Sequence, residues 1–120
     1  MKDREFVARL IERAKRANCS ALVVTMDLQT VGQRHKDIRN GAPSSVSALP
    51  AIVEAAGRRI EVHMDGGIRS GQDVLKALAL GAKGTYIGRA FLYGLGAMGE
   101  AGETKALELT HKELDLSMAF

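Results

Sequence analysis

The chain has 120 residues, 46% hydrophobic and 26% charged, which is the size and composition of one soluble globular domain. No apolar run approaches the roughly 20 residues that cross a bilayer, and the charged start lacks a signal core, so a cytoplasmic location is expected. The single cysteine, Cys19, excludes an internal disulfide and a multi-cysteine metal site, and no metal is predicted. The net charge of +3 comes from basic residues interleaved with acidic ones, and 4% of residues are aromatic, so nucleic-acid binding is not expected.

The first part of the chain predicts a helix and then a strand. Asp3 can cap a helix whose apolar residues recur at three- and four-residue spacing: Phe6, Val7, Leu10, Ile11 and Ala14. Residues 21–27 form a short apolar run that ends in polar groups, as in a strand buried on both faces. Residues 28–43 show no period and are predicted to be a loop.

The rest of the chain repeats the alternation of helices and strands. A helix is expected from Ser44 or Ser45 to Gly57, and a second one from the cap at Ser70 to Gly81. Strands are expected at residues 60–64 and 84–88. A helical turn over residues 90–95 and an amphipathic helix over residues 103–118 complete the chain.

This alternation predicts an α/β fold with parallel strands joined by right-handed crossovers. In such folds the ligand lies beyond the carboxyl ends of the strands. Those ends carry polar residues and glycines in all three predicted strands, at residues 25–27, 64–67 and 87–89. The functional site is therefore expected at this edge.

Two of the strand ends combine glycine with arginine. Gly66 and Gly67 permit a sharp turn and close approach of a ligand, and Arg69 supplies donors suited to phosphate oxygens. Ser70 is expected to begin a helix whose free N–H groups attract an anion. Gly88 and Arg89 repeat the combination of glycine and arginine after the next strand. The two strand ends with glycine and arginine together predict a phosphate site; the alternative is a tight turn with two surface arginines.

Asp65, which precedes this loop, also has two readings. It accepts hydrogen bonds from ligand hydroxyls, or it caps the following turn. A role directly on the phosphate is disfavoured because the two negative charges would repel each other.

The stretch MDGGIRSGQDVLKALALGAKGTYIGRAFLYGLGAMGEAGETKALELTHKELDLSMAF resembles the C-terminal part of the FMN-dependent α-hydroxy-acid dehydrogenases and oxidases. The stretch ALVVTMDLQTVGQRHKDIRNG resembles the fourth strand and following loop of the same barrel. The resemblance covers nearly the whole chain and implies a partial (β/α)₈ TIM barrel that contains strands 4, 7 and 8. It also implies FMN as cofactor and oxidation of an L-2-hydroxy acid, such as lactate, to the 2-oxo acid.

The resemblance assigns roles to individual positions. The residues that fall on the family's FMN ribityl and phosphate positions are Asp65, Gly66, Gly67, Arg69, Gly88 and Arg89. Thr25 falls near the flavin ring, and Arg34 falls on the arginine placed near the substrate.

The family pattern is interrupted where Asn40 is joined directly to Gly41. Roughly 80 to 90 residues, two to three βα units, are missing at this join, and residues 1–120 are interpreted as one partial domain. The family's catalytic histidine lies in the missing part, so no residue is assigned as catalytic. His35 in the loop and His63 in a strand do not match it; His63 is expected to pack between strand and helix with a backbone partner, and His111 to lie on the surface.

Three functional hypotheses follow. The first is a segment of an FMN-dependent 2-hydroxy-acid dehydrogenase; the second is an FMN- or phosphate-binding module or inactive fragment without turnover. The third, a different phosphate-handling barrel enzyme, is disfavoured because the resemblance continues to Met118. The substrate side chain and the electron acceptor are not specified by the residues present, and a full-length parent could be membrane-associated.

The predicted sheet also has consequences for assembly. Three strands cannot close an eight-stranded barrel, so two strand edges and an apolar face are expected to stay open. We therefore expect the chain to form homo-oligomers through its strand edges or to be poorly ordered.

Overall fold

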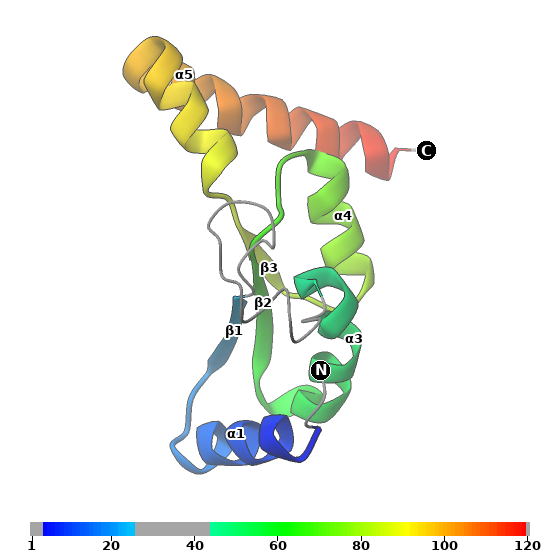
Figure 1. Cartoon of the computed structure of the whole chain (residues 1–120). Helices are drawn as coiled ribbons and strands as arrows, with labels where there is room; N and C mark the ends of the chain where they lie inside the picture. Colours follow the sequence, from blue (N-terminus) through cyan, green and yellow to red (C-terminus); the bar gives the residue numbers. More distant parts are fainter. Residues whose placement is uncertain (1–3, 26–43, 120) are drawn as a thin grey trace.

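The computed structural model describes residues 4–25 and 44–119, and helices alternate with strands along them (Figure 1). The elements are α1 (Arg4–Arg16), β1 (Ala21–Thr25), α3 (Ser45–Ala56), the short 3₁₀ helix η1 (Gly57–Arg59), β2 (Glu61–Asp65), α4 (Gly71–Ala79), β3 (Gly84–Tyr86) and α5 (Arg89–Met118). The proposed cap at Asp3 and the loop at residues 28–43 lie outside the described residues.

The three strands form one parallel sheet in the order β1-β2-β3. The expected α/β fold is therefore confirmed. The register pairs Thr25 with Asp65 and Asp65 with Tyr86, so the carboxyl ends of all three strands meet at one edge. This is the edge at which the functional site was expected.

The hydrophobic core lies between the sheet and the helices α3 and α4, which cover the same face of it in Figure 1. Val62 and Met64 of β2 are buried there with Leu49 and Ile52 of α3. The start of α3 is capped as predicted, because the Ser44 hydroxyl accepts a hydrogen bond from the Ser47 N–H. The buried residues of β2 and α3 and the cap of α3 thus lie where the sequence pattern predicted them.

The elements within residues 4–25 and 44–119 leave the opposite face of the sheet largely uncovered. Val23 of β1 is 45% exposed and Tyr86 of β3 is 48% exposed. The strand expected at residues 21–27 is confirmed for its described part, but its burial on both faces was wrong; the exposed Val23 agrees instead with the expected open apolar face. An apolar run reflects burial on both faces only when a second layer covers the sheet, and the described helices α3 and α4 cover one face.

Helix α1 buries part of its predicted apolar stripe. Ile11 is 2% exposed and Val7 packs against the core, whereas Phe6 is 52% and Leu10 is 43% exposed. The Lys15 ammonium donates to the carbonyl oxygen of Ala55 at 3.2 Å, at the end of α3. The helix therefore lies at the amino-terminal end of the strands, next to α3 (Figure 1).

The predicted turn and final helix form one segment, α5, with a sharp reversal at Gly99. Gly99 has φ 65° and ψ −146°, which glycine adopts readily because it has no Cβ. The two arms of α5 touch at Gly94 and Gly102, where an added Cβ on either residue would collide with the backbone of the other. The second arm returns to α4 (Figure 1). None of the described helices is long and apolar enough to span a membrane.

Candidate functional site

The central feature of the carboxyl edge is a pair of side chains on neighbouring strands. The Thr25 hydroxyl donates a hydrogen bond to Oδ2 of Asp65 at 3.2 Å. Both residues end their strands, and their Cα atoms are register partners. The sheet thus brings together a hydroxyl and a carboxylate that lie 40 residues apart in the chain.

The turn after β2 has the predicted glycine geometry. Gly66 and Gly67 have φ values of 95° and 83°, in the left-handed region that favours glycine. A Cβ at Gly67 would meet no described atom within 4 Å, and the same holds for Gly88 after β3. Open space at both positions lets a ligand approach the backbone closely.

The start of α5 is suited to bind an anion. Arg89 is its first residue and Gly88 its N-cap; no described side chain accepts a hydrogen bond from this end, and its first turn contains no acidic residue. The first N–H groups of a helix lack partners within the helix, and the positive end of the helix dipole attracts negative charge. Arg89, which is half-buried, adds a positively charged residue at the first position of the helix.

The start of α4 differs from the expectation of free N–H groups. The Gly71 N–H donates to Oε2 of Glu113 at 2.9 Å, and the Asp73 N–H donates to the Ser70 hydroxyl at 3.3 Å. Oδ2 of Asp73 in turn accepts from the Ser70 hydroxyl at 3.0 Å and from the Arg69 N–H at 3.2 Å. The predicted cap at Ser70 is confirmed, but the Glu113 carboxylate and the Ser70 hydroxyl take two of the N–H groups at this helix start.

The sequence prediction thus placed most of the candidate residues at one edge. Thr25, Asp65, Gly67 and Gly88 meet there, and the exposed Arg69 follows in the same turn. Arg34 and the Asn40–Gly41 join lie outside the described residues. Asp73 and Glu113 were missed.

A signal for Asp73 was present, since a serine followed three residues later by an acidic residue marks a capping box. Glu113 gave no comparable signal because its partner, Gly71, is 42 residues away.

His63 does not lie between strand and helix, which corrects that expectation. Its neighbours Val62 and Met64 face the core, so His63 projects from the opposite face of the sheet. Its Nε2 lies 3.4 Å from Oε2 of Glu61, and its ring centroid lies 6.0 Å from that of Tyr86. His111, as expected, is on the surface, 3.2 Å from the Asp115 carboxylate.

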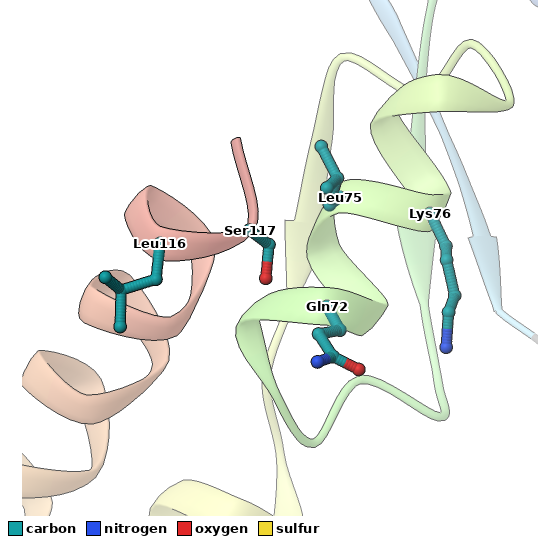
Figure 2. A pocket seen from close by; sticks show the side chains of 5 residues that line it. All are labelled: Gln72, Leu75, Lys76, Leu116 and Ser117. Carbon is teal, nitrogen blue, oxygen red and sulfur yellow. The ribbon is translucent and has the colours of Figure 1, made fainter. Parts of the chain in front are cut away.

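A separate groove of about 490 Å³ lies between α4 and the end of α5. Figure 2 shows that it is lined by Gln72, Leu75 and Lys76 of α4 and by Leu116 and Ser117 of α5. None of these residues belongs to the strand ends. Within residues 4–25 and 44–119, no group of three or more His, Cys, Asp or Glu residues is placed to hold a metal ion.

The chain is similar to known flavoenzymes over most of its length. An L-lactate dehydrogenase of Caulobacter vibrioides is 55% identical over 80 residues, which are 67% of this chain and 21% of that protein. A pre-mycofactocin synthase of Mycobacterium tuberculosis is 43% identical over 108 residues, 90% of this chain and 26% of that protein. A solved mandelate oxidase mutant with a monooxide FMN adduct matches with a TM-score of 0.77 and 35% identity, over 93% of this chain and 33% of that one.

The chain therefore spans about a fifth to a third of the length of these relatives. The model of the family described as FMN-dependent dehydrogenase matches it in two segments, residues 1–43 and 39–120. Together these segments cover every residue. The chain belongs to the FMN-dependent dehydrogenase family.

Proposed function

We propose that this chain supplies the FMN ribityl and phosphate site of an enzyme that oxidises an L-2-hydroxy acid to the 2-oxo acid. The observation that carries the proposal is the parallel register that brings Thr25, Asp65 and the two open glycine turns to one edge. TIM-barrel enzymes bind their ligands at this edge, often with phosphate after the last two strands.

The residues at the edge fit the chemistry of FMN. Its phosphate would be held by the backbone at Gly67 and Gly88 and by the guanidinium groups of Arg69 and Arg89. Asp65 would accept from a ribityl hydroxyl, with Thr25 orienting its carboxylate. The alternative role of Asp65 as a turn cap is less favoured, because its Oδ2 accepts from the neighbouring strand and Asp73 caps the turn at Ser70.

The proposed reaction follows from family membership. FMN, when bound, would supply an acceptor for the two electrons that the substrate releases on losing its C2 hydrogen and its hydroxyl proton. Arg34 would clamp the substrate carboxylate, since a planar guanidinium meets a carboxylate with two parallel hydrogen bonds. The substrate class follows the relatives named for lactate and mandelate, although the pre-mycofactocin synthase matches more of the chain.

We further infer that β1, β2 and β3 correspond to strands 4, 7 and 8 of the family barrel, with a deletion at the Asn40–Gly41 join. In a complete barrel, strands 5 and 6 would separate the first two of these. In this chain β1 pairs directly with β2 through five register pairs, from Ala21–Glu61 to Thr25–Asp65. The two matched family segments, which overlap only at residues 39–43, support the same join.

Flavin titration tests the cofactor proposal. The chain should quench FMN fluorescence on binding and should bind riboflavin, which lacks the phosphate, at least about tenfold more weakly, the scale of one charged hydrogen-bonded contact. Equal affinities for the two flavins would refute the proposed phosphate site.

A second candidate function is an FMN-binding module without turnover. His63 is engaged by Glu61 and Tyr86, and His111 lies on the second arm of α5, away from the strand ends. We therefore assign no base to the described residues and expect no oxidation of L-lactate or L-mandelate with an artificial electron acceptor. Substrate-dependent bleaching of bound flavin would show that the chain is a complete enzyme.

We also propose that the chain forms homo-oligomers in the cytoplasm. Exposed Val23 and Tyr86 lie on the open sheet face, and Tyr93 and Met98 on the first arm of α5 are 71% and 67% exposed. Apolar surface of this kind favours association. Sedimentation should show oligomers, or denaturant titration should show unfolding without cooperativity; a compact monomer that unfolds cooperatively would contradict this proposal.

A further inference from the structure

The contact between α4 and the second arm of α5 is unusually close. The Gly71 N–H donates to Glu113 Oε2 at 2.9 Å, and Gly71 is buried. A Cβ at Gly71 would collide with the backbone of Thr110, Glu113 and Leu114. Only glycine lets the two helices approach so closely, and the Glu113 carboxylate binds at the contact.

This contact is linked to the turn that carries Arg69. Asp73, two residues after Gly71, accepts hydrogen bonds from the Ser70 hydroxyl and the Arg69 N–H. A displacement of the α4 start would therefore displace the backbone at Arg69. The hydrogen bond from Gly71 to Glu113 thus bears on the position of one proposed phosphate ligand.

Helix α5 connects both halves of the proposed phosphate site. It begins at Arg89, reverses at Gly99, and returns so that Glu113 reaches the start of α4. Figure 1 shows the two arms, and Figure 2 shows the end of the second arm beside α4. The segment α5 therefore begins at Arg89, and its second arm is hydrogen-bonded to Gly71, two residues after Arg69.

From this geometry we propose that Glu113 is a positioning residue for the FMN phosphate. Its carboxylate fills the α4 N-terminus and fixes the turn at Arg69 relative to the start of α5, so that the phosphate is held at the uncapped α5 end. This inference rests on the proposed FMN site. In this role Glu113 favours the binding of FMN over that of riboflavin, although its side chain touches neither flavin.

The alternative is that Glu113 only stabilises the fold. Loss of stability alone would weaken both flavins to a similar extent, because the isoalloxazine and ribityl groups are common to them. A positioning role would weaken FMN selectively. The ratio of the two dissociation constants therefore separates the two roles.

The test compares three variants with the wild type by fluorescence titration of FMN and riboflavin. Glu113→Ala should weaken FMN about fivefold and leave riboflavin within about twofold, the scale expected for losing one part-buried hydrogen bond to a carboxylate that acts indirectly. Glu113→Gln keeps an acceptor oxygen and should retain the wild-type ratio. Glu108→Ala, which removes an exposed carboxylate paired with Lys105 on the same arm, is the matched control and should change neither affinity.

Each result has a defined meaning. If the wild type binds both flavins equally or binds neither, the proposed function fails and the role of Glu113 fails with it. If the wild type prefers FMN and Glu113→Ala keeps that preference or binds FMN more tightly, only the role of Glu113 is overturned. Should Glu113→Ala not fold, Glu113→Asp, whose shorter side chain keeps the charge but loses reach, must lower the ratio in the same direction.

Discussion

The starts of α4 and α5 carry the same combination of glycine and arginine at a strand end, but they differ in what fills them. At α4, Glu113 and the Ser70–Asp73 pair accept from the backbone N–H groups of Arg69, Gly71 and Asp73, and the Arg69 side chain is exposed. At α5, none of the side chains in the described part of the chain caps the helix, and Arg89 is half-buried. A helix start becomes available to a ligand only where the chain leaves its N–H groups free.

The difference also shows how one site can be built from two similar motifs. The start of α4 is held in place by hydrogen bonds within the chain. At the start of α5, the N–H groups and the positive end of the helix dipole stay available to an anion. The glycines follow the same division, since Gly71 is packed against backbone and Gly88 faces open space. Four substitutions test this division, in order of decreasing expected effect.

The largest effect is expected for Gly71→Ala. The new Cβ would collide with the α5 backbone at Thr110 and Leu114, so the free energy of unfolding should fall by about 3 kcal/mol. Gly88→Ala is the control because its Cβ would meet nothing within 4 Å, and it should stay within about 1 kcal/mol of the wild type. Denaturant titration measures the free energy of unfolding of both variants. Equal losses of stability would show that the two helix starts do not differ in packing.

Arg89→Ala should weaken FMN binding by about 2 to 3 kcal/mol, because Arg89 is a half-buried residue at the helix start proposed to bind the phosphate. Fluorescence titration measures this loss. Arg58→Ala removes an exposed guanidinium at the other end of β2 and should leave the affinity unchanged. An Arg89 variant that binds like the Arg58 variant would contradict the assignment.

Arg69→Ala should weaken FMN binding less, by about 1.5 kcal/mol, because water can replace an exposed guanidinium more readily than a half-buried one. The same titration gives the order of the two effects. A larger loss at Arg69 than at Arg89 would mean that the phosphate is held mainly by the turn after β2.

The smallest effect is expected for Ser70→Ala, which removes the N-cap of α4 and should lower the free energy of unfolding by about 1 kcal/mol. Ser44 caps α3 with the same geometry, so Ser44→Ala should cost a similar amount. Thermal or denaturant unfolding of the two variants checks this. A negligible loss at Ser70 alone would show that Glu113 and Asp73 hold the α4 start without it.

Local signals predicted much of this protein. Ser44, Gly57 and Ser70 mark helix ends because capping and positive φ are determined by the residue and its immediate neighbours. The glycine turn after β2 was predictable for the same reason. Parallel strands also follow from the alternation of elements, and these strands place the candidate residues at one edge.

Tertiary structure decided what local patterns cannot encode. The apolar run of β1 by itself implied two buried faces, and the strand count implied one open face; the exposed Val23 agrees with the second, because burial depends on which elements are present to cover a strand. The start of α4 looked open to an anion until the reversal at Gly99 brought Glu113 back to Gly71 across 42 residues. Contacts between distant segments depend on the path of the whole chain, so only the fold determined which of the two helix starts remains free.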